Sequence, residues 1–190
     1  DEYREVFAVA PAQVQAMMEL TYRTLQRPES DILDWTVANL ATKDGKRILR
    51  VEQAKVRGTT GRVVDIALSP DLDALLRKLV GEVPKIGRRL VCASRGEFAG
   101  KPYTYDGISS MLKRSIAKAN AERKKAGIDP IPSFGYRDLK GKGATDMWLA
   151  GIPLEEIQLL CGHEDKTTTE IYVKQRWRET ATPNMVQMAV

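Results

Sequence analysis

Cysteine and histidine are scarce in this chain, which has 190 residues but only two cysteines and one histidine. Cys92 and Cys161 lie far apart in the sequence and form no CxxC pair. That spacing indicates neither a disulfide framework nor a zinc site, and it favours a reducing compartment.

Long apolar runs are also absent. No stretch reaches about 18 apolar residues, the length that a membrane-spanning helix needs. The first residues, DEYREVF, are acidic and polar, unlike a signal peptide. We therefore expect a soluble intracellular protein without a membrane partner.

The composition that is present indicates a folded domain with a polyanionic partner. Hydrophobic residues make up 43% of the chain, which is enough to bury a core and excludes a disordered protein. Thirty Lys and Arg against 25 Asp and Glu leave a formal net charge of +5. This basic excess makes nucleic acid the first partner to test, although charge alone does not identify it.

Apolar periodicity and boundary residues predict about seven helices. Ser69 and Pro70 are typical of a helix start, and Gly81 is typical of a helix end. Gly162 similarly follows an apolar segment. The predicted helices span 11–26, 29–35, 69–81, 104–125, 133–151, 152–162 and 167–174.

Short apolar runs replace the helical pattern between Arg47 and Leu68. The runs ILRV and VVDIAL are separated by a Gly-Thr-Thr-Gly cluster at 58–61, which predicts two antiparallel strands. The expected fold class is therefore α+β and mainly α, with about seven helices and a small antiparallel sheet.

The predicted helix at 104–125 carries many cations. Lys113, Arg114 and Lys118 belong to a group of six basic residues that is accompanied by one acid, Glu122, in its C-terminal two thirds. Such a face is either simply solvated or follows a phosphate backbone, where counterion release strengthens binding. The charge pattern does not decide between the two.

Two strings near the C-terminus carry the strongest functional signal. The segment LLCGHEDKTTTEIYVK resembles the LLGHxSxxTTxxYxH motif of the tyrosine recombinases, or phage integrases. In that family the histidine precedes a nucleophilic tyrosine by nine positions, as His163 precedes Tyr172. The family commonly has an arginine 23 positions before that histidine, where this chain has Lys140.

The resemblance extends towards the N-terminus through two weaker matches. TLQRPESDIL at 24–33 is similar to the family's TGLRxxE turn and implies that Arg27 is the first catalytic arginine, with Arg23 as the competing assignment. VEQAKVRGTTGRVVDIAL at 51–68 resembles the family's β-hairpin and implies that Lys55 enters the active site.

The resemblance covers nearly the whole chain and implies its organisation. Residues 1–175 would form the DNA breaking and rejoining catalytic domain, without the family's N-terminal DNA-clamping domain. Residues 176–190 would form a C-terminal tail that docks on a neighbouring protomer or folds on its own domain. The family implies a homo-tetramer on duplex DNA attachment sites, accessory DNA-bending proteins, and a cytoplasmic, nucleoid-associated location in a bacterium.

The chemistry that the family implies suits these residue types. Tyr172 would attack a DNA phosphodiester to give a 3′-phosphotyrosyl link without any cofactor or metal. Arg27 would hold the non-bridging oxygens through its guanidinium fork, and Lys55 would protonate the leaving 5′-oxygen. His163 would bind the phosphate or assist proton movement.

Arg137 and Lys140 depart from the family pattern, which has histidine and then arginine at this spacing. Lysine keeps the charge but loses the two-donor fork, which weakens phosphate anchoring by about one to several kcal/mol. A shifted register would make Arg137 the second arginine and place Phe134 at the histidine position, although the 23-residue spacing opposes it. Full activity with exchanged basic roles, slow activity, and DNA binding without cleavage all stay open.

The leading hypothesis is a site-specific DNA recombinase, or integrase, of a prophage or mobile element. The alternatives are a catalytically impaired DNA-binding integrase homologue and a type IB topoisomerase-like enzyme. A protein with no nucleic-acid role would show no salt-dependent DNA affinity. The expected catalytic residues are Arg27, Lys55, Arg137, Lys140, His163 and Tyr172, and the expected DNA-binding residues are Lys113, Arg114, Lys118 and Lys142.

Overall fold

The computed structural model describes residues 2–52, 63–81, 85–93 and 96–174. These ranges contain seven α-helices and a three-stranded antiparallel sheet, which confirms the predicted mainly helical α+β class. The helices are α1 (Glu2–Val9), α2 (Ala12–Thr24), α3 (Pro70–Val80), α4 (Tyr105–Lys125), α5 (Tyr136–Leu149), α6 (Leu154–Cys161) and α7 (Lys166–Lys174). The strands are β1 (Leu40–Lys43), β2 (Lys46–Glu52) and β3 (Val63–Ala67), and short 3-10 turns occur at η1 (Ile32–Asp34), η2 (Val37–Asn39) and η4 (Gly96–Phe98).

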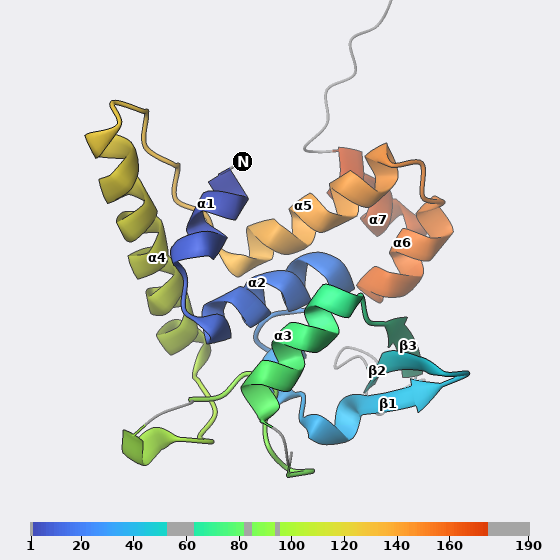
Figure 1. The fold of residues 1–190 in the computed structure, drawn as a ribbon. Helices are drawn as coiled ribbons and strands as arrows, with labels where there is room; N and C mark the ends of the chain where they lie inside the picture. Colours follow the sequence, from blue (N-terminus) through green and yellow to red (C-terminus); the bar gives the residue numbers. More distant parts are fainter. Residues whose placement is uncertain (1, 53–62, 82–84, 94–95, 175–190) are drawn as a thin grey trace, which may run out of the picture.

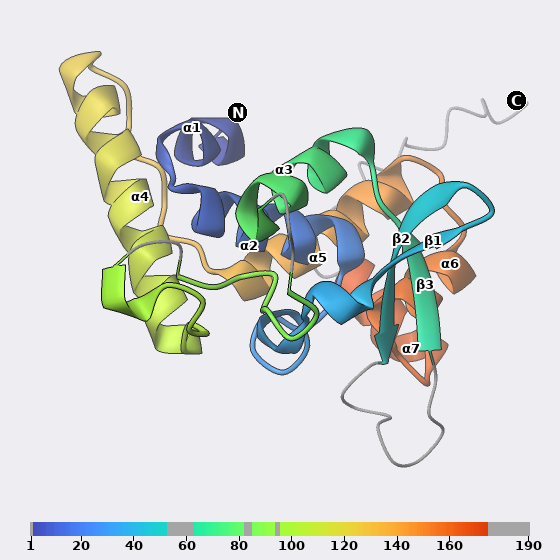
Figure 2. The same cartoon turned by 60° about the horizontal axis from the view of Figure 1, so that its bottom comes forward.

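Helix α2 lies at the centre of the molecule and packs against both α3 and α5. Figures 1 and 2 show α1 and α4 at one end, with the sheet, α6 and α7 at the other. Most buried side chains form one large core around α2. A second, smaller core joins the end of α2 to α5, α6 and α7.

Residues predicted to begin or end helices do so in the structure. The Ser69 hydroxyl accepts a hydrogen bond from Leu72 N at the start of α3, and Thr104 caps α4 in the same way. Gly81 and Gly162 end α3 and α6 with positive φ angles, which glycine adopts without steric cost.

The helix predicted at 29–35 is wrong. This segment contains only the 3-10 turn η1, and Trp35 is already extended. The Asp31 carboxylate turns back to accept the N–H of Arg27, which favours a tight turn over a continuing helix. The number of helices in the described ranges is still seven, because it includes α1, which was not predicted. Helix α1 has a single fully buried residue, Val6, so its sequence shows little apolar periodicity.

The sheet has one strand more than predicted. Strands β2 and β3 form the expected antiparallel pair, and β1 adds to β2 through a two-residue turn. Asp44 and Gly45 in that turn have φ angles of 50° and 73°, as a type I′ hairpin requires. The Asp-Gly pair was the sequence signal for this missed strand.

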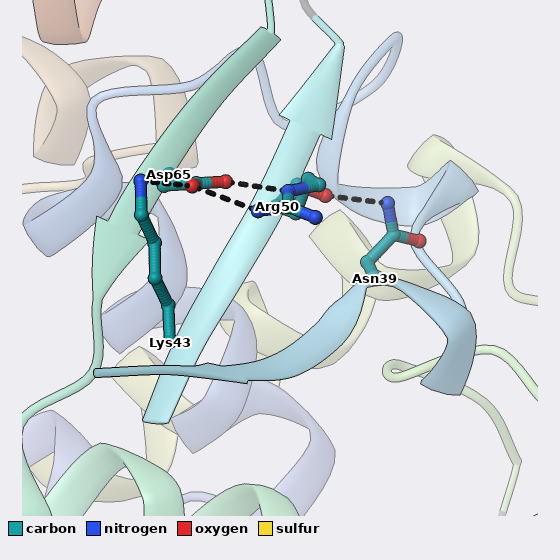
Figure 3. A network of polar contacts seen from close by, with 4 residues as sticks. All are labelled: Asn39, Lys43, Arg50 and Asp65. Atoms are coloured by element: carbon teal, nitrogen blue, oxygen red, sulfur yellow. Dashed lines mark hydrogen bonds and ion pairs between the residues drawn. The ribbon is translucent and has the colours of Figure 1, made fainter. Parts of the chain in front are cut away.

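A polar network fixes the register of the three strands (Figure 3). Arg50 lies directly opposite Asp65 and donates two hydrogen bonds to its carboxylate, over 2.7 and 2.9 Å. Lys43 of β1 donates to the same carboxylate over 3.1 Å, and Asn39 donates to the Arg50 carbonyl over 2.9 Å. Hydrogen bonds from Arg50 and then Lys43 hold the pKa of Asp65 well below its usual range. Cross-strand pairs of this kind oppose a slip of β2 against β3, the strands that flank residues 53–62.

The described ranges contain neither a membrane-spanning helix nor a cluster of metal-ligating side chains. No helix there has both the length and the apolar character needed to cross a membrane. No group of three or more His, Cys, Asp and Glu residues in the described part of the chain is placed to hold a metal ion.

Candidate active site

The loop after α2 begins with an unusual backbone conformation at Leu25. This residue closes α2 with φ 53° and ψ 23°, a left-handed conformation that costs a non-glycine residue about 1 kcal/mol or more. Its side chain is fully buried in the small core. The burial holds the turn that presents the following residues, Gln26 and Arg27.

Arg27 is anchored by a buried carboxylate. Its backbone N–H donates to Asp31 Oδ2 over 3.0 Å, and its Nη1 lies 3.9 Å from the same oxygen. Asp31 is 1% exposed, whereas the Arg27 side chain is about one third exposed. Arg23, the competing assignment, pairs instead with Glu19 within α2.

Lys140 lies beside this pair although it comes from α5. Its side chain is buried, with only 5% of the residue exposed. Burial lowers the pKa of Lys140, and the positive charge of Arg27 lowers it further, while Cys161 and Asp31 oppose this shift. Burial raises the pKa of the Cys161 thiol to about 11, against the opposing effect of Lys140 and Arg27. Lys140 and Cys161 are thus both buried, and each interacts electrostatically with Arg27.

His163 is held in place between α6 and α7. It follows Gly162 and is 7% exposed. Its Nδ1 lies 3.0 Å from Thr169 Oγ1 of α7. Its backbone N–H donates to Gln158 O, and the Gln158 side chain donates to its carbonyl. These contacts fix the imidazole ring and leave the opposite ring nitrogen as the one directed away from Thr169.

Two predicted catalytic residues are described only in part or not at all. Tyr172 belongs to α7, the helix that contacts His163 through Thr169. Lys55 falls in 53–62, outside the described residues, between β2 and β3 in the sequence.

Arg137 lies one helical turn before Lys140 but faces the surface. Its side chain is 73% exposed and its Nη2 lies 3.5 Å from Glu29. Its guanidinium carbon is also 5.7 Å from the centre of the Tyr105 ring. The structure therefore brings Lys140 into the cluster with Arg27 and leaves Arg137 at its edge.

The small core explains how distant segments reach one site. It consists of five buried residues, and four of them lie within a few positions of a predicted catalytic residue. Burying these apolar side chains together thus also aligns the loop after α2 with α5, α6 and α7. The five residues are Leu25, Ala144, Ile157, Cys161 and Val173.

Comparison with known proteins shows the family of this chain. The model of the phage integrase family matches residues 2–178. The chain belongs to the phage integrase family. A search of curated proteins gave no match.

Solved structures of integrases and recombinases share the fold of this phage integrase domain. A lambda integrase dimer bound to a COC′ core site has a TM-score of 0.65 and 22% identity, over 98% of this chain and 62% of that one. XerH site-specific recombinase in a post-cleavage complex with a palindromic difH substrate has a TM-score of 0.64 and 17% identity, over 92% and 48%. Tn1549 transposon integrase with a circular intermediate DNA has a TM-score of 0.63 and 16% identity, over 83% and 52%. This chain therefore spans less than two thirds of each of these relatives.

The predicted DNA-binding residues of this integrase domain lie outside the cluster. Lys113, Arg114 and Lys118 are exposed on α4, which both ribbon views place at the opposite end from α6 and α7 (Figures 1 and 2). Lys142 is exposed on α5 and pairs with Asp146, which also accepts a 2.7 Å hydrogen bond from the Tyr22 hydroxyl.

Sequence reasoning missed two residues that shape the integrase site, Asp31 and Gln26. Asp31 lies in the wrongly predicted helix at 29–35, whereas its buried carboxylate accepts the N–H of Arg27 and favours the charged form of Lys140. Gln26 gave no sequence signal, but its side chain joins the loop after α2 to α6. The spacing of Arg27 and Asp31, one helical turn apart, was the available clue for the first.

Proposed function

We propose that this domain is a site-specific DNA recombinase that cuts and rejoins duplex DNA through a 3′-phosphotyrosyl intermediate on Tyr172. The observation that carries the proposal is the joint placement of Arg27 and the buried Lys140 beside Cys161, two positions before His163. His163 in turn contacts α7, the helix that carries Tyr172.

A phosphodiester suits this cationic site. The positive charge of Arg27 disfavours the charged form of Lys140, and the single carboxylate of Asp31 offsets only part of their combined charge. A bound phosphate supplies the missing negative charge, and the weakly hydrated surroundings strengthen its attraction to both cations. The site is thus arranged to stabilise charge on non-bridging oxygens while phosphorus is five-coordinate.

The proposed step replaces one phosphate ester bond with another and so requires no external energy source. Tyr172 Oη passes its proton to His163, the proposed acceptor, and forms a bond to phosphorus, while the bond from phosphorus to the 5′-oxygen breaks. The 5′-oxygen keeps the electron pair and takes a proton from Lys55, which gives a free 5′-hydroxyl. Attack by another 5′-hydroxyl reverses the sequence and rejoins the strands.

The proposed partner is duplex DNA at attachment sites. Among the structural relatives, lambda integrase is described as a dimer on a core site and as a tetramer on a Holliday junction. We propose a homo-tetramer on DNA for this chain as well, with accessory DNA-bending proteins and a cytoplasmic, nucleoid-associated location. The proposed docking tail, 176–190, lies outside the described residues.

Covalent capture tests the proposal. Wild-type protein incubated with nicked suicide duplexes from the ends of its encoding element is expected to form an adduct seen by denaturing electrophoresis. Tyr172→Phe should abolish that adduct, because the nucleophilic oxygen is lost. Tyr103→Phe, the same change in a tyrosine just before α4, is the control and should retain it.

Other outcomes separate the alternatives. Tight binding without an adduct from the wild-type protein would identify an impaired DNA-binding homologue. Relaxation of supercoils without site preference would favour a type IB topoisomerase-like enzyme. An adduct that survives Tyr172→Phe would contradict the proposed nucleophile.

The exposed cations of α4 are proposed to bind DNA phosphates away from the scissile bond. Replacing Lys113, Arg114 and Lys118 together with alanine should weaken binding to any duplex. The slope of log binding constant against log salt concentration should fall by about 2 to 3, because each phosphate contact releases a condensed counterion. Lys142 is a weaker candidate, since a phosphate must compete with Asp146 for its ammonium group.

Fluorescence anisotropy at several salt concentrations measures this slope. Alanine at the exposed Lys46, Lys78 and Lys85 is the control, because it removes the same charge from other parts of the surface. An equal loss of slope in both triple variants would show that α4 has no special role.

A further inference from the structure

Gln26 connects the two halves of the candidate site through its side chain. The residue is 2% exposed. Its Nε2 donates to the carbonyl of Thr24 over 3.0 Å and to the carbonyl of Leu160 near the end of α6. The two N–H groups of this amide thus donate to carbonyls at the end of α2 and near the end of α6, which are far apart in the sequence.

The two ends of this connection adjoin predicted phosphate ligands. Arg27 follows Gln26 directly, and Leu160 lies three positions before His163. Leu160 O belongs to the last turn of α6, where carbonyl groups commonly accept hydrogen bonds from outside the regular helix. The amide therefore joins the loop that carries Arg27 to the helix end that positions His163.

The backbone around Gln26 needs such support. Leu25 holds a left-handed conformation that is unfavourable for a leucine. A strained residue persists only where the surrounding structure over-determines it. Here the restraints are the burial of the Leu25 side chain and the two hydrogen bonds of the next side chain along the chain.

We propose that Gln26 is a positioning residue that sets the separation between Arg27 and His163 for a single phosphate. This inference rests on the proposed recombinase function, because it deepens the role of the same site. Donors that bind one transition state must be held within about 0.5 Å of the productive geometry. Displacement by about 1 Å can lower a rate about 10²-fold.

Glutamine has the required chemistry because both of its partners are acceptors. Methionine has a similar length but no N–H donors, so Gln26→Met removes both bonds and leaves two carbonyl groups without this partner. In Gln26→Glu an ionised carboxylate would face those carbonyl oxygens and also attract the neighbouring Arg27. Protonation of that carboxylate restores one O–H donor and removes the charge.

Single-turnover cleavage of a nicked suicide duplex by the whole protein tests the inference. Gln26→Met should lower the rate constant at saturating DNA by about 10- to 100-fold with little change in the DNA dissociation constant. Gln26→Glu should be similarly slow at neutral pH and should recover as the pH falls, whereas Gln26→Met should not. Gln13→Met is the matched control, since Gln13 is a buried glutamine in the first turn of the same α2 helix.

NMR gives a readout that does not depend on activity. His163 is the only histidine, so its imidazole gives a single, unambiguous set of signals. Gln26→Met should shift these signals in DNA-free protein, and Gln13→Met should not.

Each result has a definite meaning. Wild-type rates in Gln26→Met together with unchanged His163 signals would overturn the inference. Equal losses of rate in Gln26→Met and Gln13→Met would also overturn it, because they would indicate general destabilisation. Shifted His163 signals in Gln26→Met, when even the wild-type protein forms no adduct, would support the positioning role and reject the recombinase function.

Discussion

Replacing Lys140 with methionine is expected to lower the rate of DNA cleavage by about 10²- to 10³-fold, as loss of one transition-state donor does in other enzymes. The melting temperature should nevertheless stay the same or rise. Burial lowers the pKa of Lys140, which means that the folded protein disfavours its charged form. Methionine fills a similar volume without a charge. The folded state therefore no longer pays for burying a charged group, while the site loses its proposed phosphate ligand.

The pH dependence of wild-type stability relative to Lys140→Met follows from the direction of the Lys140 pKa shift. Because the pKa of Lys140 is lower in the folded state, the cost of its charge is fully present below that folded pKa. As the pH rises from there towards the unfolded value of about 10.4, the unfolded chain binds more protons and the free energy of unfolding of the wild type rises relative to Lys140→Met. Cleavage should fall over the same range, because a neutral amine no longer offsets phosphate charge.

Lys140→Arg keeps the positive charge at this position but removes its titration. Arginine stays protonated throughout this range, so cleavage by Lys140→Arg should persist at alkaline pH where wild-type cleavage declines. Lys78→Met, at an exposed lysine of α3 outside the proposed DNA-binding set, is the control and should change neither profile. Rapid adduct formation by Lys140→Met would exclude Lys140 as a phosphate ligand. An adduct formed only by Lys140→Arg would make the natural protein an impaired DNA binder.

Gly143→Ala is expected to destabilise the domain by about 1–3 kcal/mol. A Cβ atom at this position would lie 2.2 Å from Tyr22 O and 2.7 Å from Leu25 Cδ2. Helix propensity alone predicts the opposite sign, since alanine is favoured over glycine inside a helix by about 0.5–1 kcal/mol. Packing dominates here because the nearest atom belongs to the backbone of α2, which cannot move aside as a flexible side chain can.

The same substitution should slow cleavage, because it forces α5 away from the end of α2. Lys140 moves with α5, and Leu25 is one of the two contacts of the new methyl group, two positions before Arg27. Urea denaturation and adduct formation on the same samples measure both effects. Gly87→Ala is the control, since nothing lies within 4 Å of its added Cβ and its φ is not positive. Equal stability of Gly143→Ala and the wild type would show that α2 and α5 do not pack this closely.

The predictions that were confirmed depend on local chemistry. Ser69 and Thr104 bond to the backbone three positions ahead, so the starts of α3 and α4 can be located without knowledge of any distant residue. The wrong helix at 29–35 failed because its outcome depends on Asp31, which could cap a helix or turn back to Arg27. The tertiary structure made that choice, because it buries Asp31 against Arg27.

The sequence alone determined the family, the order of the candidate catalytic residues and the interval from His163 to Tyr172, because these are properties of spacing along the chain. Only the tertiary structure decided that Lys140 is buried beside Arg27 while Arg137 faces solvent. It also decided that Asp31 accepts the N–H of Arg27 and that the Gln26 side chain bonds to α6. Burial and the hydrogen bond between the loop after α2 and α6 arise from contacts between segments more than 100 residues apart, and no local pattern encodes them.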